Sequence, residues 1–277
     1  MSGADDGEQA MIKIGILGCA GRMGRALLAE VDGSSRALLS GGTVRPGASP
    51  LVHTADGRSF ADSIDEDAAA LFARSDVLID FTSPKASLDH LALACSHEKP
   101  LVLGTTGFTA DQQADIDDAA RTIPILQAAN FSLGISLLSS LVRQAARALG
   151  PEFDAEILEM HHRHKVDAPS GTALALGRAV AMGRGVDLDE MSEKLRDGQI
   201  GPRVPGRIGF ATLRGGDVVG EHQVIFAGMG ERLVLSHLAS DRQIFARGAV
   251  HAALWLATRW QEDQTPGLFD MADVLGL

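Results

Sequence analysis

The sequence lacks three features that would each point to a particular class of protein. Its 277 residues include only two cysteines, Cys19 and Cys95, which are far apart and in no metal-ligand spacing, so neither a disulfide framework nor a zinc site is indicated. No apolar run approaches the ~20 residues that a membrane-spanning helix needs. Residues 1–10 have neither the basic nor the apolar region of a signal peptide. These absences favour a protein of the reducing cytoplasm.

Positive charge is also scarce, with 25 Lys and Arg against 36 Asp and Glu and a formal net charge of −11. A general nucleic-acid binder needs clustered Lys and Arg to neutralise phosphates, so that function is not expected. An acidic protein that binds an anion must concentrate positive charge locally, which draws attention to the few basic clusters in the chain. The length allows one large domain or two of ordinary size, and two is the better prediction.

The first half of the chain alternates short apolar strands with amphipathic helices. Residues 11–17 are predicted to form a buried strand and residues 22–31, with apolar side chains at helical spacing, a helix. The alternation continues through strands at 37–44, 77–81, 101–104 and 123–128 and helices at 84–97 and 110–121. This pattern predicts an α/β fold with a Rossmann-like parallel sheet covered on both faces.

The pattern changes after Asn130, where adjacent strand candidates replace the alternation. Predicted elements are helices at 131–149 and 170–182, a strand at 153–161, a long polar loop at 183–206, strands at 208–213, 218–226 and 233–237, and a last helix at 242–260. Such a run of strands indicates a smaller α+β domain with a mixed or antiparallel sheet. The last helix could pack back on the first domain. We therefore expect a dinucleotide-binding domain of residues 1–130 and 241–277 and a substrate-binding domain of residues 131–240.

A glycine-rich turn joins the first predicted strand to the first helix. Such a turn lets the backbone approach a pyrophosphate at the N-terminus of the helix. The spacing is Gly-x-x-Gly-x-x-Gly rather than the commoner Gly-x-Gly-x-x-Gly, and a simple turn is the alternative. The cofactor-binding residues predicted here are Gly18, Cys19, Ala20, Gly21, Arg22 and Met23.

The end of the second predicted strand bears on the choice of cofactor. An acidic residue there selects NAD, whereas an arginine accommodates the 2′-phosphate of NADP. This chain has Val44 and Arg45, and Arg45 with Arg22 could form a phosphate clamp. The prediction is NADPH, with NADH possible. The alternative is that Arg45 is an ordinary solvated charge.

Two further turns follow strands of the predicted parallel sheet and are candidates for the nicotinamide site. The carboxyl ends of such strands form the edge at which open α/β sheets bind ligands. Each turn could equally be an ordinary polar turn. The residues concerned are Gly104, Thr105 and Thr106, and Ala128, Ala129, Asn130 and Phe131.

A cationic cluster near the middle of the chain suggests acid-base chemistry on an acidic substrate. If residues 157–165 are extended, Glu159, His161, Arg163 and Lys165 lie on one side. His161 is then the candidate acid and Lys165 its partner, with Glu159 orienting the imidazole. No His-Glu-x-x-His pattern or cysteine pair supports a metal site.

Directly after this cluster, Ser170 is a possible N-cap of the helix predicted at 170–182. Its small neighbours, Gly171 and Thr172, would leave backbone N–H groups open to a substrate carboxylate. Capping alone is the alternative, because serine is an ordinary N-cap. The substrate expected from both features is a small carboxylic acid.

The chain closely resembles the 4-hydroxy-tetrahydrodipicolinate reductase (dihydrodipicolinate reductase) family of the diaminopimelate route to lysine. The resemblance covers nearly everything after Met11. It is carried by residues 18–24, 80–82, 104–108, 128–134, 159–174 and 210–226, the last including Gly220-Glu221-His222. The chain departs from the pattern at Val44, where members often have an acidic residue, and at Ser83, where some have a basic one.

The resemblance implies an activity, site residues and an assembly. The activity is NAD(P)H-dependent reduction of 4-hydroxy-tetrahydrodipicolinate to tetrahydrodipicolinate. It further implies a homotetramer assembled through the sheet of the second domain. The implied roles are proton donor and catalytic partner for His161 and Lys165, and contacts to the small dicarboxylate substrate for His162, Gly171 and Thr172.

Two other functions remain as alternatives. A semialdehyde dehydrogenase would need a thiol nucleophile in the second domain, and neither cysteine lies there. A non-catalytic NADPH-binding sensor would keep the glycine turn but would have no need of an acid, a lysine and a carboxylate site together.

Overall fold

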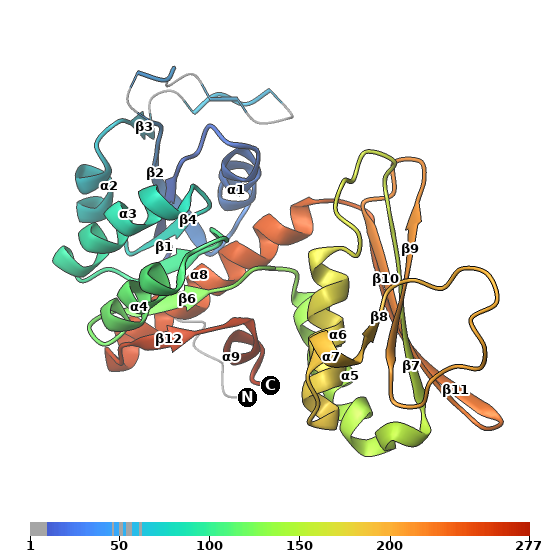
Figure 1. The fold of residues 1–277 in the computed structure, drawn as a ribbon. Helices are drawn as coiled ribbons and strands as arrows, with labels where there is room; N and C mark the ends of the chain where they lie inside the picture. Colours follow the sequence, from blue (N-terminus) through green and yellow to red (C-terminus); the bar gives the residue numbers. More distant parts are fainter. Residues whose placement is uncertain (1–9, 46, 50–51, 54–56, 61–62) are drawn as a thin grey trace, which may run out of the picture. The chain divides into compact units, whose positions relative to one another are not determined.

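The computed structural model describes residues 10–45, 47–49, 52–53, 57–60 and 63–277 (Figure 1). The chain divides into two compact units. Unit 1 comprises Met1–Phe131 with Phe245–Val274, and unit 2 comprises Ser132–Ile244 with Leu275–Leu277. Among the described residues, the structure contains no helix with both the length and the apolar character required to cross a membrane.

Unit 1 is built on a seven-stranded sheet in the order β12-β6-β5-β4-β1-β2-β3, and all its strand pairs are parallel. The central strands β4 and β5 are buried along their whole length, because helices cover both faces of the sheet. The strands are β1 (Ile12–Leu17), β2 (Ala37–Thr43), β3 (Ile64–Asp65), β4 (Val77–Asp80), β5 (Leu101–Leu103), β6 (Pro124–Gln127) and β12 (Gly267–Phe269).

The helices of unit 1 begin at residues suited to helix starts. Pro84 opens α3, where its fixed φ and missing N–H cost nothing, and Thr109 caps α4 in a capping box with Gln112. The helices are α1 (Arg22–Asp32), α2 (Ala68–Arg74), α3 (Pro84–Ser96), α4 (Ala110–Ala119), α8 (Gln243–Asp263) and α9 (Met271–Leu275).

The strand order places the ligand-binding edge of this sheet. The chain passes from β1 to β2 on one side and returns to β4 on the other, so the order reverses at β1. In open α/β sheets, ligands bind in the crevice outside the carboxyl ends of the strands at such a switch point. The glycine turn after β1 lies at this point.

Unit 2 has a five-stranded sheet in the order β11-β10-β7-β9-β8. Its central strand β7 pairs in parallel with β9 and antiparallel with β10, so the sheet is mixed. Together the two sheets confirm the predicted fold class, a Rossmann-like parallel sheet with a second, mixed-sheet domain. The strands are β7 (Asp154–His161), β8 (Ser192–Glu193), β9 (Ile208–Arg214), β10 (Gly220–Gly228) and β11 (Glu231–Ala239).

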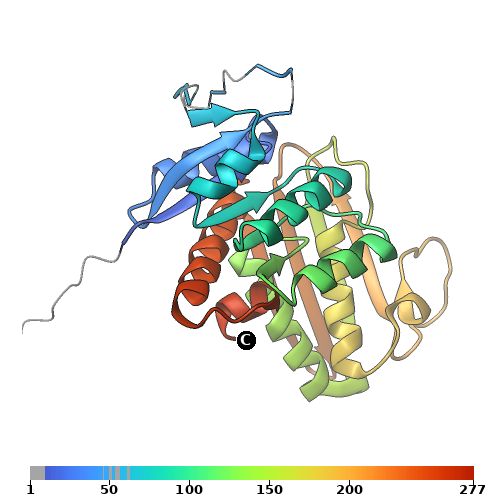
Figure 2. The same ribbon diagram turned by 90° about the vertical axis from the view of Figure 1, so that its left-hand side faces the viewer.

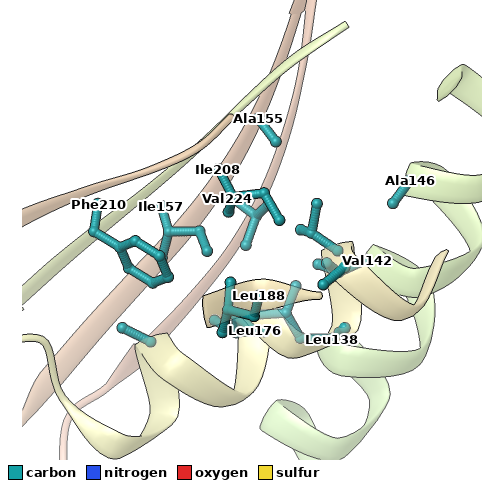
Figure 3. Close-up of a cluster of buried hydrophobic side chains, with 14 of the residues drawn as sticks. Leu138, Val142, Ala146, Ala155, Ile157, Leu176, Leu188, Ile208, Phe210 and Val224 are labelled. Carbon is teal, nitrogen blue, oxygen red and sulfur yellow. The ribbon is translucent and has the colours of Figure 1, made fainter. Parts of the chain in front are cut away.

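Two long helices, α5 (Leu133–Leu149) and α6 (Gly171–Arg184), pack side by side and cover one face of this sheet (Figure 2). Leu138 of α5 and Leu176 of α6 meet Ile157 and Val224 of the sheet in a buried apolar cluster (Figure 3). The other face carries exposed apolar side chains, among them Val234 and Leu238 of β11. A short 3₁₀ helix, η2 (Gly150–Glu152), links α5 to β7.

The predicted loop at 183–206 is partly wrong. This segment contains the short helix α7 (Leu188–Met191), capped by the side chain of Asp187, and the strand β8, which pairs with β9. Their sequences, LDEM and SE, contain no run of three adjacent apolar residues, whereas the equally short strands β4 and β5 do and were predicted. The same limit explains why β3 and β12 have no counterpart in the sequence prediction.

Candidate active site

The glycine turn after β1 leaves its backbone accessible to a ligand. Gly18 has φ +70°, and a Cβ there would lie 2.5 Å from Thr82, so a side chain is excluded on both grounds. Gly21 precedes α1 as its N-cap, and no side chain caps that helix. The first-turn amides of an 11-residue helix therefore remain available for an anion, as a pyrophosphate requires.

A cavity of about 670 Å³ opens at this turn. Four of the predicted cofactor residues line it: Gly18, Ala20, Gly21 and Arg45. The remaining lining residues come from the ends of β2, β3 and β4 and from the helices that follow them, and are Thr43, Val44, Ala48, Glu66, Ala68, Phe81, Thr82, Ser83, Ala86, Asp89 and His90. The glycine turn and this cavity fit a dinucleotide.

The other predicted residues of the turn do not line the cavity. Cys19 is fully buried, and burial raises the pKa of its thiol to about 11. Its backbone N–H donates to the carbonyl of Thr43 at 2.8 Å. Arg22 is exposed and Met23 half-buried at the start of α1. The Cys19 thiol is therefore a packing group rather than a group that faces a ligand.

The two turns after β5 and β6 adjoin the cavity through one aromatic ring. A Cβ on Gly104 would lie 2.1 Å from the ring of Phe81, and the ring of Phe131 is 5.2 Å from the same ring. Thr105 is buried and its hydroxyl accepts from Ser87 at 2.9 Å. The remaining members of these turns are half-buried Ala128 and Asn130 and exposed Thr106 and Ala129.

A buried carboxylate that sequence reasoning left without a role organises one wall of the cavity. Asp80, at the end of β4, accepts from the backbone N–H and hydroxyl of Thr82 at 2.8 and 2.7 Å. Its second oxygen lies 2.7 Å from Nδ1 of His90. Residues 80–82 belong to the family resemblance, but no local pattern in the sequence gives Asp80 a role. The partner His90 lies ten residues away, and the pairing depends on how α3 packs beside β4.

The centre of the second candidate site is a carboxylate and an imidazole on one face of β7. Glu159 and His161 are alternate residues of the strand and both are buried. Nδ1 of His161 lies 2.5 Å from Oε2 of Glu159. Because an ionised carboxylate can only accept, Nδ1 is the donor, and Nε2 is left to exchange a proton with a ligand.

Arg214 of β9 keeps this carboxylate charged. Its guanidinium donates to both oxygens of Glu159, at 2.8 and 3.0 Å, and the backbone N–H of Ser170 adds a third bond at 3.1 Å. Burial raises the pKa of Glu159, but the hydrogen bonds from Arg214 and His161 outweigh it and the pKa is lowered overall. Glu159 is therefore an anion at neutral pH.

Neighbouring groups and burial shift the pKa of the His161 imidazole in opposite directions. Burial lowers its pKa, the hydrogen bond and charge of Glu159 raise it, and the positive charges of Lys165 and Arg214 lower it again. The net result is a pKa below the ordinary value for histidine. A lowered pKa makes the protonated ring a stronger acid.

A second buried histidine lies beside the first. The ring of His222, from β10, is 5.0 Å from that of His161, and its Nε2 is 3.1 Å from the hydroxyl of Ser170. Burial, followed by the charge of His161, lowers the pKa of His222 to about 4. Ser170 also accepts from the N–H of Ala173 and so caps α6, as predicted.

The placement of Lys165 on the strand with His161 is wrong. β7 ends at His161 and the chain turns, with the N–H of Lys165 donating to the carbonyl of His162 at 3.1 Å. Arg163 is consequently exposed. The ammonium group of Lys165 donates to Asp167 at 2.8 Å. This turn, rather than strand alternation, keeps Lys165 near Glu159 and His161.

The remaining predicted substrate contacts lie around the same turn. Nε2 of His162 is 3.1 Å from the guanidinium of Arg242. Gly171 is the exposed first residue of α6, and a Cβ built on it would meet nothing within 4 Å. Thr172 follows it in the first turn. The N-terminus of α6 is therefore open on the side of Gly171.

Fold and site together define a two-unit oxidoreductase with a nucleotide-binding unit, and such a unit in a reductase implies a nicotinamide cofactor. Two family models match the chain, "Dihydrodipicolinate reductase, N-terminus" over residues 12–131 and "Dihydrodipicolinate reductase, C-terminus" over residues 134–275. The chain belongs to the dihydrodipicolinate reductase family.

Individual proteins similar to this chain carry the name of the same reductase. The chain is 51% identical over 266 residues to a 4-hydroxy-tetrahydrodipicolinate reductase of Chelativorans sp. (strain BNC1), covering 94% of each chain. It is 49% identical over 270 residues to that of Zymomonas mobilis, covering 98% of this chain and 99% of the relative. The solved dipicolinate-bound dihydrodipicolinate reductase from Paenisporosarcina sp. TG-14 shares the fold, with a TM-score of 0.75 at 24% identity over 95% of this chain and 99% of that one.

Proposed function

We propose that this protein reduces 4-hydroxy-tetrahydrodipicolinate to tetrahydrodipicolinate, with loss of water, on the diaminopimelate route to lysine. The observation that carries the proposal is the buried pair of Glu159 and His161 beside the N-terminus of α6. It stands in a chain 49–51% identical to relatives that bear the name of this reductase.

The residues of unit 1 would hold a nicotinamide dinucleotide. The glycine turn and the first turn of α1 would bind its pyrophosphate, and Phe81 with the turns at 104–106 and 128–131 would adjoin its nicotinamide end. When bound, NADPH or NADH supplies the hydride. Arg45 lines the cavity, and no carboxylate ends β2, so we propose that NADPH is preferred and NADH is possible.

His161 supplies the proton of the reaction. Addition of a hydride to the conjugated imine of the dehydrated ring leaves an enamine, which needs a proton on carbon. Nε2 of His161 donates it, while Glu159 fixes the orientation of the ring and stabilises its charged form. We assign Lys165 as the partner in this step, with Asp167 holding its ammonium group near the turn.

The substrate carries two carboxylates, and the residues after β7 would bind them. The first-turn amides of Gly171 and Thr172 offer N–H groups at the positive end of a 14-residue helix. The guanidinium of Arg242, which donates to Nε2 of His162, and the ammonium group of Lys165 add positive charge, and His162 is a further contact. Fixed charges of this kind orient the ring for reaction without reorganising.

We further propose that the substrate-binding domain, residues 131–240, assembles the protein into a homotetramer through the open face of its sheet. That face exposes Leu213, Val234 and Leu238, with 48%, 48% and 62% of each residue accessible. The dinucleotide-binding domain in this proposal comprises residues 1–130 and 241–277.

The direct test is the initial rate of cofactor oxidation with substrate generated in situ from pyruvate and aspartate semialdehyde. Turnover that is faster with NADPH than with NADH is the expected result. Faster turnover with NADH would keep the reaction and remove the role given to Arg45. Binding of NADPH without turnover would contradict the reductase and favour a non-catalytic NADPH-binding sensor, which no feature of unit 2 supports.

A further inference from the structure

The end of β2 lacks a group that dinucleotide sites commonly have. A carboxylate about 20 residues after the glycine turn accepts hydrogen bonds from the adenosine ribose and favours NAD. In this chain the residue after β2 is Val44, whose side chain is buried, and the next is Arg45. Neither can accept a hydrogen bond from a ribose hydroxyl through its side chain.

The neighbouring strand supplies a carboxylate at the same level. β3 runs parallel to β2 with Thr43 opposite Asp65, and the N–H of Val44 donates to the carbonyl of Asp65 at 3.1 Å. Glu66 therefore directly follows β3 at the level where Val44 directly follows β2. Parallel strands are about 4.8 Å apart, so the carboxylate is displaced by one strand from the usual place.

Glu66 is directed to the cofactor cavity. It lines the cavity together with Gly18, Gly21 and Arg45. Its Oε1 accepts from the backbone N–H of Gly47 at 3.1 Å, which ties the carboxylate to the turn that follows Arg45. An ionised carboxylate has about four acceptor positions, so this bond leaves capacity for ribose hydroxyls.

We infer that Glu66 is a specificity-determining residue that binds the adenosine ribose of NADH and limits the preference for NADPH. The inference rests on the proposed function, because it concerns the same cofactor cavity. A carboxylate accepts the 2′- and 3′-hydroxyls of NADH but repels the 2′-phosphate of NADPH, to which Arg45 is attracted. The cavity thus presents opposite charges from adjacent strands, and each favours a different cofactor.

The test is isothermal titration calorimetry of the full-length protein with NADH and with NADPH, which compares the Kd values of wild type and Glu66→Gln. Glutamine keeps an oxygen for the N–H of Gly47 but removes the charge. We expect the Kd for NADH to rise about tenfold, as for loss of a hydrogen bond to a charged group, and the Kd for NADPH to stay or fall. Asp67→Asn is the matched control, since Asp67 caps α2 and does not line the cavity.

Three results would overturn the inference. Glu66→Gln could leave the Kd values for NADH and NADPH unchanged, or could raise the two equally. It could also change them by the same amounts as Asp67→Asn, which would make the effect one of overall charge. A shift produced by Asp89→Asn and not by Glu66→Gln would assign the ribose to the other acidic residue of the cavity. If wild type binds neither dinucleotide, the proposed function itself fails, and this outcome is distinct from the others.

Discussion

At the residue scale, Glu159 is the group on which the candidate active site depends. It has 1% of its surface exposed, yet it remains charged because Arg214, His161 and the N–H of Ser170 all donate to it. Removing one partner of a buried ion pair costs free energy, so the pairing with Arg214 holds this carboxylate in place beside the imidazole. Its charge should be visible in the titration of His161.

Glu159→Gln should move the alkaline limb of the pH profile of kcat/KM to lower pH. His161 must be protonated to donate, so activity falls as pH rises through its pKa, and Glu159 raises that pKa against the lowering by burial. Loss of a neighbouring charge corresponds to about 1–3 pH units. NMR titration of the His161 ring gives the same pKa without turnover.

Glu152→Gln is the control for this experiment, because Glu152 is an exposed carboxylate of η2 just before β7 and belongs neither to the candidate site nor to the open face of the sheet. The alkaline limb of the kcat/KM profile of this control variant should lie at the same pH as in wild type. An unchanged limb in Glu159→Gln would refute the coupling between the two residues.

His222 should make the protein less stable in mild acid. Its pKa is about 4 in the folded protein and about 6.5 when unfolded, so the unfolded chain binds more protons between these values. The free energy of unfolding should therefore decrease as pH falls from 6.5 towards 4, by up to about 3 kcal/mol. Urea denaturation across this range measures the slope.

In that experiment His222→Gln should have a flatter profile, since glutamine can still meet the hydroxyl of Ser170 and does not titrate. A slope equal to that of wild type would show that His222 does not contribute to the acid sensitivity.

Part of the candidate active site follows from local sequence patterns, and the rest does not. Period-two alternation correctly placed Glu159 and His161 on one face, because both lie within β7. It failed for Lys165, where the strand has already ended. Arg214 and His222 belong to other strands and lie 53 and 61 residues after His161 in the sequence. Their proximity depends on sheet register, which no local pattern reports.

At the element scale, different parts of α6 contribute to the candidate active site and to the apolar core. Its N-terminus carries Ser170, Gly171 and Thr172 at the candidate active site, while Leu176 lies in the apolar core (Figure 3), as does Val180. The core holds the helix against the sheet, and so it sets where the N-terminal amides lie.

Leu176→Ala should lower the free energy of unfolding by about 2–5 kcal/mol, as expected for a fully buried leucine that leaves a cavity. Met182→Ala on the same helix is the matched control, because 66% of Met182 is exposed, and its effect should be within about 0.5 kcal/mol. Chemical denaturation measures both. Equal losses for the two variants would contradict the packing described for α6.

Elements with a local apolar pattern were predictable from the sequence, and elements without one were not. The apolar run of β4 and the helical spacing of α1 are local signals. By contrast, the segment at 183–206 is held by Arg196 and Arg203, which both pair with Glu156 of β7. An ion-pair network across about 40 residues of chain leaves no periodic trace.

At the scale of the whole molecule, the open face of the unit 2 sheet is the proposed contact between copies. Val234 and Leu238 point to the same side of β11 because they are separated by an even number of residues. Large exposed apolar patches commonly mark association sites.

The double variant Val234→Lys with Leu238→Lys should dissociate the assembly. Sedimentation equilibrium should give four times the chain mass for wild type and a smaller species for the variant, because each interface would bury unpaired charges. Met182→Lys, on the helical layer of the same unit, should stay tetrameric. A monomeric wild type, or a tetrameric double variant, would refute this interface.

The measurement that tests the central claim most directly is kcat for His161→Gln, beside wild type and His164→Gln. His164 is an exposed histidine in the same turn and provides the matched control. Loss of a general acid predicts that kcat for His161→Gln falls about 10²–10⁴-fold while the Kd for NADPH is unchanged, with His164→Gln close to wild type. A kcat for His161→Gln equal to that of wild type would contradict the assignment of His161 as the proton donor.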